Sequence, residues 1–370
     1  MEIEKGAKWV KFGVLERFMK DVFTGLGVPA ADAAVCADVL LTADKLGIDS
    51  HGVSRLKPIY YDRIKEGIQL PRTKFEIVKQ TPTTAVIDGH NGMGHVIAAR
   101  AMQLAVKKAK KYGLGMTAVR NSTHYGIAGY HAMLASKAGM IGITGTNARP
   151  SVAPTFGVEN MMGTNPLTFA IPTDEKFPFL LDCATSVTQR GKIEVYAKLR
   201  KKMPKGWVID SKGGSKTDSA AVLRDLVAGT AALVPVGGIG EELGGYKGYG
   251  YCAAVEILSA ALQQGAYMKM LLGVKDGKKT PYPLGHFFLA INIEAFTPLK
   301  SFKKTAGDIL RGLRASKKMP GAKRIYTAGE KEYLNLRYRR HKGVPLNRET
   351  QAEIIAMRDE LKLTGYKFDF

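Results

Sequence analysis

The hydrophobic period of the chain changes near residue 73, and this change constrains the fold more than any other feature. Before it, apolar residues recur every three or four positions, which predicts helices over 13–27, 30–46 and 53–65. After it, short apolar runs bounded by turn residues predict strands separated by helical stretches. Strands that alternate with helices indicate an α/β fold. We expect the strands at 75–79, 84–88, 116–119, 140–145, 166–171, 178–182 and 287–293, and the helices at 96–112, 127–138, 251–264, 301–315 and 348–361.

Composition and charge exclude several classes of protein. The chain carries 55 Lys and Arg against 33 Asp and Glu, for a net charge of +22, but the basic residues are spread along amphipathic segments without a nucleic-acid-binding motif. No apolar run reaches the roughly 18 residues of a membrane span, and the start does not resemble a secretory signal. We therefore expect a cytoplasmic protein that binds neither nucleic acid nor membrane.

The three cysteines give no sign of a metal centre. Cys36, Cys183 and Cys252 form no CxxC pair and no metal-ligand spacing. Buried thiols are the expected role for all three. We expect no metal site.

Two histidines lie in short polar clusters that contain glycine. His51 follows Ser50 and precedes Arg55 by four residues, and His124 lies in the run from Asn121 to Gly126. Histidine exchanges a proton near neutral pH, and arginine binds a carboxylate through two parallel hydrogen bonds. The hydroxyl of Tyr60 can add to that grip. These residue types are suited to a site for a 2-hydroxy acid or a 2-oxo acid.

Several further segments are candidate ligand sites. Residues 236–250 hold seven glycines but no GxGxxG, so we interpret them as a ligand loop in which Lys247 meets a phosphate or a carboxylate. Asn165 lies in a Gly-Thr-Asn run, where short polar side chains bind ribose or phosphate oxygens or make local turns. Asp182, at the end of a predicted strand, either orients a histidine or caps the next helix. Residues 200–216 are expected to form an exposed loop or lid.

Taken in order, five motifs resemble the type 2 malate/L-lactate dehydrogenase family. The resemblance covers about residues 13–345 and includes the sulfolactate dehydrogenase-like members, ureidoglycolate dehydrogenase and the Δ1-piperideine-2-carboxylate reductases. It implies an NAD(P)-dependent oxidoreductase and a homodimer. It also implies an α/β fold with a non-Rossmann, mixed-sheet cofactor domain at 73–304 and a helical domain made of 1–72 and 305–370. The motifs are 49–52 with Arg55, 121–126, 163–166, 182–186 and 244–250.

The resemblance also implies roles for individual residues. His124 matches the proton acceptor of ureidoglycolate-type members, and Ser50 and His51 match a pair that works with the aspartate at Asp182 in imine-reducing members. The spacing from Arg55 to Tyr60 is one residue longer than usual, and Ala328 stands where the family often has proline before Gly329. The cofactor contacts expected from the resemblance and from the polar motifs are Thr123, Ala148, Asn165, Asp182, Cys183, Ala184, Leu233, Pro235, Lys247 and Gly329.

The hypothesis from the sequence is the reversible oxidation of an L-2-hydroxy acid, with malate as the first candidate. Arg55 holds the carboxylate, His124 accepts the hydroxyl proton, and His51 with Ser50 and Asp182 either shares the proton transfer or polarises the oxygen. NAD and NADP both remain open, and so do sulfolactate, lactate, ureidoglycolate and a cyclic imino acid as substrates. A basic nucleic-acid-binding protein and a non-catalytic metabolite-binding module are the alternatives from other classes. Salt-dependent retention of nucleic acid would indicate the first, and cofactor binding without turnover the second.

Overall fold

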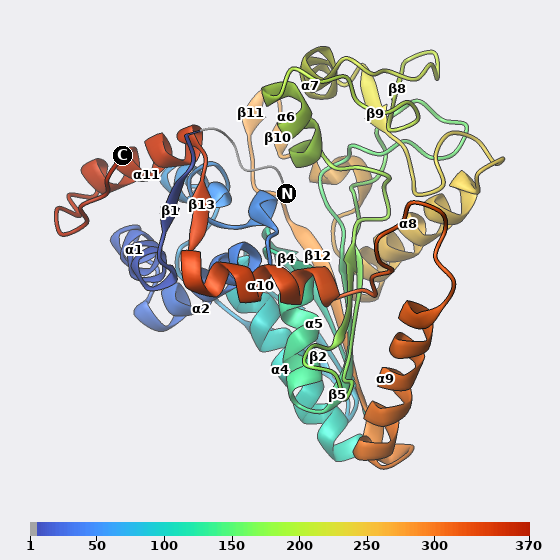
Figure 1. Cartoon of the computed structure of the whole chain (residues 1–370). Coiled ribbons are helices and arrows are strands. Elements are labelled where there is room, and N and C mark those ends of the chain that lie inside the picture. Colours follow the sequence, from blue (N-terminus) through green and yellow to red (C-terminus); the bar gives the residue numbers. More distant parts are fainter. Residues whose placement is uncertain (1–5) are drawn as a thin grey trace.

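A mixed seven-stranded sheet forms the centre of the computed structural model, which describes residues 6–370 (Figure 1). Its strand order is β2-β3-β4-β12-β5-β6-β7, and all neighbours are antiparallel except β3 and β4. The α/β prediction is confirmed, and β12, which is late in the sequence, lies between β4 and β5. The strands are β2 (Glu76–Gln80), β3 (Thr84–Asp88), β4 (Leu114–Ser122), β5 (Met140–Thr146), β6 (Leu167–Ile171), β7 (Phe179–Cys183) and β12 (Leu284–Asn292).

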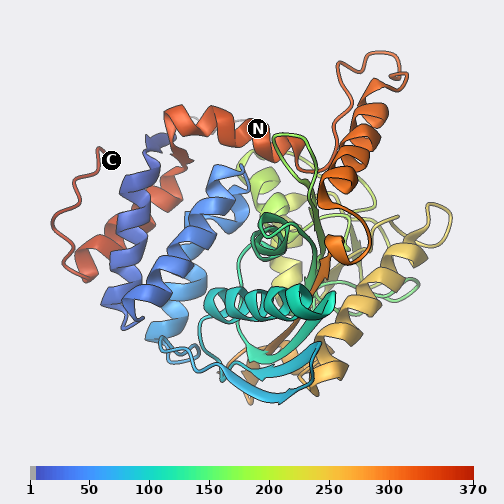
Figure 2. The ribbon, with the colours of Figure 1, turned by 90° about the horizontal axis from the view of Figure 1, so that it is seen from below.

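Helices cover both faces of this sheet (Figures 1 and 2). On one face lie α4 (Gly94–Tyr112) and α5 (Ala128–Lys137), and glycines permit their close approach. A Cβ at Gly115 of β4 would lie 2.0 Å from the Ala105 carbonyl oxygen of α4. On the other face lies α8 (Gly245–Ala260), where a Cβ at Gly285 would lie 1.7 Å from the Ser259 carbonyl oxygen.

A second core joins the two ends of the chain. Helices α1 (Phe12–Gly25) and α2 (Ala30–Lys45) pack with residues of β13 (Val344–Leu346), α11 (Arg348–Glu360) and the C-terminal tail. Strand β1 (Lys8–Val10) pairs with β13, and α10 (Glu330–Lys342) runs across α2 (Figure 1). Side chains far apart in the sequence therefore meet in one hydrophobic cluster.

A small lobe with its own core follows β7. It contains α6 (Arg190–Lys198), β8 (Val208–Asp210), α7 (Ser219–Ala228) and β9 (Ala231–Leu233). Strand β8 lies inside the 200–216 segment that we expected to be a loop, and it pairs with β9. The apolar residues Val208 and Leu233 are buried between these short elements.

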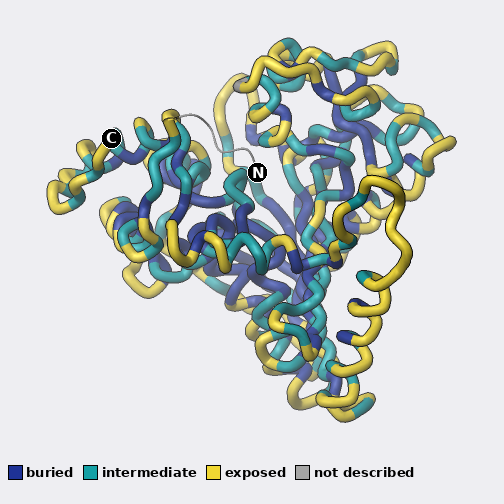
Figure 3. Tube along the Cα trace, viewed as in Figure 1, coloured by how far each residue is buried: buried dark blue, intermediate teal, exposed yellow. Residues whose placement is uncertain are grey.

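Two outlying elements complete the described chain. The hairpin of β10 (Val274–Lys275) and β11 (Lys278–Lys279) precedes β12. Helix α9 (Leu299–Ala315) projects from the body, and most of its surface is exposed (Figures 2 and 3). Within residues 6–370, no helix combines the length and the hydrophobicity that crossing a membrane requires. Short helical turns lie at η4 (Ala261–Gln263), η5 (Met268–Leu271) and η6 (Ile293–Ala295).

The predicted helix over 53–65 is not continuous. The structure has 3₁₀ turns η1 (Asp49–His51) and η2 (Val53–Arg55), a π-helical turn η3 (Leu56–Tyr61) and a short α3 (Asp62–Lys65). A π turn accommodates one residue more than an α turn, and such turns often occur at functional sites. It coincides with the segment where the spacing from Arg55 to Tyr60 is one residue longer than the family pattern.

Candidate active site

The loop of residues 49–55, called the histidine loop below, is fixed to its surroundings by buried polar groups. The carboxylate of Asp44, at the end of α2, accepts a hydrogen bond of 2.8 Å from the Val53 backbone N–H. A Cβ at Gly52 would lie 1.8 Å from the same carboxylate, so only glycine fits there. From α10, the guanidinium of Arg339 binds the Asp49 carboxylate with both of its terminal nitrogens and the Asp44 carbonyl oxygen at 2.6 Å.

The two histidines singled out in the sequence lie side by side. The ring centroids of His51 and His124 are 5.9 Å apart and the ring planes differ by 19°. Both side chains are partly exposed. The Ser50 hydroxyl lies 2.9 Å from Nδ1 of His51. The fold therefore brings together residues that are 73 positions apart in the sequence, from the histidine loop and from the segment after β4.

Two groups contact the same ring nitrogen of His124. The Tyr60 hydroxyl is 2.6 Å from His124 Nδ1, and the Gly126 backbone N–H is 3.3 Å from it. The Tyr60 hydroxyl can donate to Nδ1 or accept from it, so the neutral ring can carry its proton on Nδ1 and leave Nε2 unprotonated. That nitrogen is available to exchange a proton with a ligand. Tyr60, which we expected to bind substrate, is fully buried, and its hydroxyl contacts His124.

Both imidazoles are neutral at pH 7. Burial lowers the pKa of His51 to about 4, and the charge of Arg55 acts in the same direction. Burial also lowers the pKa of His124 well below its ordinary value, with further lowering by His51, His95, Arg63 and Arg55. Neutral imidazoles are the form that hydrogen-bonds a substrate oxygen without repelling the neighbouring arginines.

Arg55 lies in the histidine loop with its guanidinium directed toward the small lobe. Its Nε donates to the Ser50 carbonyl oxygen at 2.5 Å, and one terminal nitrogen lies 3.7 Å from a carboxylate oxygen of Glu194 in α6. A Cβ at Gly191, also in α6, would lie 3.1 Å from the Arg55 guanidinium, so a larger residue there would require Arg55 to shift by a few tenths of an ångström. The small lobe thus borders the site.

Asp182 contacts the start of a helix. One oxygen of its carboxylate accepts a 2.7 Å bond from the Gly129 N–H in the first turn of α5, and the other accepts a 2.9 Å bond from the Thr168 hydroxyl. Burial raises the pKa of this carboxyl group. Within residues 6–370, no hydrogen bond joins Asp182 to either histidine. Its carboxylate contacts α5, which precedes it in the chain, and not α6, the next helix that the capping alternative named. It thereby fixes the helix that follows the His124 segment.

Several expected cofactor residues gather at one edge of the sheet. Ala148 follows β5, Asn165 precedes β6 and Ala184 follows β7, and the register aligns Gly145, Leu167 and Cys183 across these antiparallel strands. The oxygen of the buried Asn165 amide has no hydrogen-bond partner within residues 6–370, while its nitrogen binds Glu256 at 2.6 Å. Leu233 and Pro235 connect to the same region through bridges to Val152 and Ser186.

Other expected cofactor residues lie in different surroundings. The hydroxyl of Thr123 binds the Gly92 carbonyl oxygen and the Gly94 N–H, so it ties the His124 segment to the start of α4. Lys247 is exposed in the first turn of α8. Gly329, with φ of 88°, lies beside Pro178 at the beginning of β7, at the opposite end of that strand from Ala184.

The expectation of three buried cysteines is wrong for Cys183. Cys36 and Cys252 are buried, but Cys183 is exposed. It ends the edge strand β7, where alternate side chains face outward.

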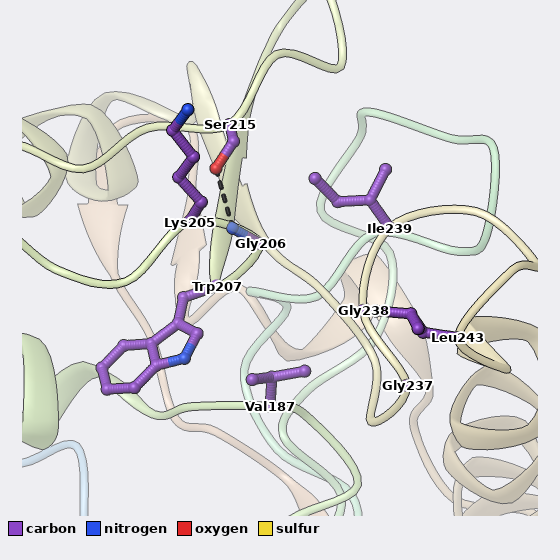
Figure 4. Close-up of a pocket in the computed structure, with 9 residues that line it drawn as sticks. All are labelled: Val187, Lys205, Gly206, Trp207, Ser215, Gly237, Gly238, Ile239 and Leu243. Carbon is purple, nitrogen blue, oxygen red and sulfur yellow. Dashed lines mark hydrogen bonds between the residues drawn. The ribbon is translucent and has the colours of Figure 1, made fainter.

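A cavity of about 570 Å³ lies between the small lobe and the glycine-rich segment (Figure 4). Its walls include Trp207 and Lys205 on one side and Gly237 and Gly238 on the other. Val187, three residues after Ala184, also lines it. The chain that leaves β7 after Ala184 therefore reaches the wall of this cavity.

A family model for malate/L-lactate dehydrogenase matches residues 10–355. The chain belongs to the malate/L-lactate dehydrogenase family. It is 46% identical to a malate dehydrogenase of Pyrococcus abyssi over 91% of this chain and 90% of that protein. It is also 37% identical to an L-sulfolactate dehydrogenase of Methanocaldococcus jannaschii over 94% of this chain and 96% of that protein.

Solved structures agree with this assignment. The malate dehydrogenase of Entamoeba histolytica matches with a TM-score of 0.94 and 43% identity, covering 98% of this chain and 100% of that one. The sulfolactate dehydrogenase of M. jannaschii matches with a TM-score of 0.84 and 36% identity, covering 96% and 98%. This dehydrogenase is an oxidoreductase, and the resemblance recognised in its motifs is confirmed.

Four residues of the dehydrogenase were not singled out by sequence reasoning. Glu194 and Arg339 contact the histidine loop from α6 and α10, and Arg63 lies near His124. His95 lies behind Tyr60 with ring centroids 4.5 Å apart. The glycine-rich turn before His95 is a local sequence signal that could have identified this residue. The contacts of the other three residues depend on how distant segments pack.

The other two buried histidines belong to the core. The rings of His131 and His286 both stack on the ring of Tyr125, with ring centroids 4.9 and 4.5 Å from the Tyr125 centroid. Burial lowers the pKa of His131 to about 4 and that of His286 to about 3. These rings are fully buried, in contrast to the partly exposed pair His51 and His124.

Proposed function

We propose that this dehydrogenase catalyses the reversible oxidation of an L-2-hydroxy acid, with malate and oxaloacetate as the preferred pair. The observation that carries this proposal is the paired His51 and His124, with Tyr60 holding His124 and Arg55 in the same loop as His51. The names of the relatives from P. abyssi and E. histolytica favour malate.

In this proposal the two polar functions of the substrate meet different side chains. Arg55 binds the carboxylate next to the reacting carbon, because a guanidinium fixes both its position and its orientation. In oxidation the neutral ring of His124, with its proton on Nδ1, takes the hydroxyl proton at Nε2 and becomes an imidazolium, and in reduction that imidazolium returns the proton to the substrate oxygen. His51, held by Ser50, polarises the same oxygen. Tyr60 and Asp182 are positioning residues, because they act through His124 and α5.

We further propose that a nicotinamide dinucleotide lies along the sheet edge formed by β5, β6 and β7. Two observations support this fit: the unpartnered oxygen of Asn165, and the glycine wall of the adjoining cavity, where Gly237 and Gly238 have φ of 99° and 86°. Ala148, Cys183, Ala184 and Pro235 would hold it without a Rossmann fingerprint. When bound, the nicotinamide supplies the hydride chemistry.

A homodimer is also proposed. Large apolar side chains are exposed on two helices of the described chain, among them Tyr251 and Ile257 on α8 and Ile309 and Leu313 on α9. Exposed apolar surface of this kind is typical of an interface between protein chains. Sedimentation equilibrium would test this, since a dimer doubles the 40.2 kDa mass of the chain.

The test of the proposed activity is a substrate panel followed at the nicotinamide absorbance. L-Malate, L-sulfolactate, L-lactate and ureidoglycolate are each offered with NAD and with NADP, and Δ1-piperideine-2-carboxylate is offered with NADH and NADPH. We expect malate to give the highest kcat/KM. His124→Ala is expected to lower kcat by about 10²–10⁴-fold, the usual contribution of a positioned acid–base group. Cofactor binding, measured by fluorescence, is expected to be retained.

Three results would contradict the proposal. Absence of turnover with every substrate would remove the hydroxy-acid activity. A higher kcat/KM with Δ1-piperideine-2-carboxylate than with malate would show that the protein is a reductase of cyclic imino acids. Near-normal turnover in His124→Ala would assign the proton transfer to His51.

A further inference from the structure

Arg63 is placed next to the proton-transfer site by the helix that carries Tyr60. It follows Tyr60 by three residues, so the two side chains share one face of the η3–α3 segment. Tyr60 contacts His124 at 2.6 Å. The guanidinium carbon of Arg63 lies 4.4 Å from the centroid of the Tyr282 ring. Tyr282 is itself fixed, because a Cβ at Gly273 would lie 2.1 Å from its ring.

The sheet register brings these residues to one edge. Strand β12 is antiparallel to both β4 and β5, with Leu284 opposite Ser122 and His286 opposite Thr146. Tyr282, just before β12, therefore lies at the edge where β4 and β5 end. The His124 segment follows β4, and Arg149 follows β5. Tyr282, on whose ring Arg63 lies, and His124 are therefore at the same edge of the sheet.

Arg63 has no direct acidic partner among the side chains that the structure describes. Its neighbour Asp62 pairs with Lys57 at 2.7 Å, and Glu66 pairs with Lys279 at 2.6 Å. Within residues 6–370, no carboxylate forms a hydrogen bond or ion pair with Arg63 itself. Burial lowers the pKa of Arg63, and the positive charge of Arg149 acts in the same direction, whereas Tyr282, Tyr60 and Glu66 act in the opposite direction. A partly buried guanidinium without an anion is costly, so this position is suited to an anionic ligand.

The two arginines beside His124 have different neighbours. Arg55 lies against α6 of the small lobe, through Glu194 and Gly191. Arg63 lies on Tyr282, next to the β10–β11 hairpin. A substrate with one anionic group can bind only one of the two arginines, whereas a substrate with an anionic group at each end can bind both.

We propose that Arg63 is the second anion-binding residue of the active site and selects L-2-hydroxy acids that carry a second negative group. This inference rests on the proposed function, in which Arg55 binds the carboxylate at the reacting carbon. The second group is a carboxylate or a sulfonate, since both present oxygen atoms in a geometry that a guanidinium can bind.

The test compares Arg63→Met with the wild type on L-malate, L-sulfolactate and L-lactate. Losing one charge-assisted contact is expected to lower kcat/KM for the substrates bound through it by about 10–100-fold, mainly through KM. Activity with L-lactate is expected to change by less than about threefold, because lactate has no second anion to lose. The relative effects on malate and sulfolactate show which of the two groups the residue binds better.

Lys65→Met is the matched control. Lys65 lies on the same short helix but binds Glu360 at the surface, so its loss should leave the preference for malate over lactate unchanged. Should Arg63→Met fail to fold, Arg63→Gln is measured in the same way, because it removes the charge and keeps a polar side chain of similar shape.

Several outcomes would overturn the inference. An unchanged ratio of malate to lactate activity in the Arg63 variant would show that the residue does not select the second anion. Weaker cofactor binding by fluorescence, with that ratio unchanged, would place Arg63 at a cofactor phosphate. Absence of turnover by the wild type with all three substrates would instead contradict the proposed function, and binding of malate by calorimetry would then decide the role of Arg63.

Discussion

The histidine loop and the glycine-rich segment of residues 237–250 are both short, rich in small residues and marked by their sequences as ligand sites, yet they are built differently. Side chains fix the histidine loop, through Asp44 and Arg339. Backbone approach fixes the glycine-rich segment, where a Cβ at Gly248 would lie 2.1 Å from the Val236 carbonyl oxygen. The second half of that segment is helix, since α8 begins at Gly245.

Glycine therefore has a different structural role in each of these two regions. In the histidine loop, Gly52 makes room for the Asp44 carboxylate, and the loop presents His51 and Arg55 to the site. In the glycine-rich segment, Gly245 and Gly248 let a helix lie against a turn, and Gly237 and Gly238 are the glycines that line the cavity. Substitutions in the histidine loop should therefore change turnover, and substitutions at Gly245 and Gly248 should mainly change stability.

The largest expected effect in this comparison is on turnover. Arg55→Met should lower kcat/KM for malate by about 10²-fold, equivalent to about 2.7 kcal/mol, because a charged contact to the carboxylate is lost. The positive charge of Arg55 also lowers the pKa of His51 and His124, after burial. Its removal raises both, and protonation disables the neutral imidazoles. The acid limb of kcat/KM should therefore move to higher pH.

The measurement is kcat/KM against pH, with Lys57→Met as the control. Lys57 carries the same charge nearby but pairs with Asp62 at 2.7 Å, so its loss should leave the acid limb in place. An acid limb that stays fixed in Arg55→Met would show that Arg55 does not act on the histidines.

The second prediction concerns the free energy of unfolding. Gly248→Ala should destabilise the protein by about 1–3 kcal/mol, the usual cost of overpacking, because the new methyl group meets the backbone of Val236. Gly250→Ala, two residues later in the same helix, meets nothing within 4 Å and should stabilise α8 by up to about 1 kcal/mol. Urea unfolding measures both. Equal effects of the two substitutions would contradict the backbone-packing role of the segment.

Local sequence patterns were sufficient for the long elements and for the residue types of the site. The period of apolar residues predicted α2, α4 and β5 to within a few residues, and the polar clusters predicted His51, His124 and Arg55 as candidate site residues. The π turn at η3 was missed, because a single extra residue leaves no distinct pattern. The short strands β8 and β9 were missed as well, since three residues give too little alternation to recognise.

Contacts between distant segments account for the rest. The insertion of β12 between β4 and β5 decides that Tyr282 lies at the same edge as His124, and no local pattern records that pairing. The bond from Arg339 to Asp49 joins residues 290 positions apart. Tyr60 was expected to face the substrate, but the fold turns its hydroxyl toward His124. Residue types thus indicated the chemistry, while packing assigned the partners.

The smallest expected effect is on KM, at a glycine of α6 that lies against the histidine loop. Gly191 in α6 faces the histidine loop, and its Cβ would lie 3.1 Å from the Arg55 guanidinium and 3.3 Å from Ser50 Cβ. Gly191→Ala should displace Arg55 by a few tenths of an ångström, raising KM for malate by about threefold, or about 0.6 kcal/mol, with kcat nearly unchanged. Steady-state kinetics measure this, with Gly250→Ala as the control that meets open space. A fall in kcat without a rise in KM would contradict this prediction. It would mean that α6 affects the proton transfer at the histidines and not the binding of the substrate carboxylate by Arg55.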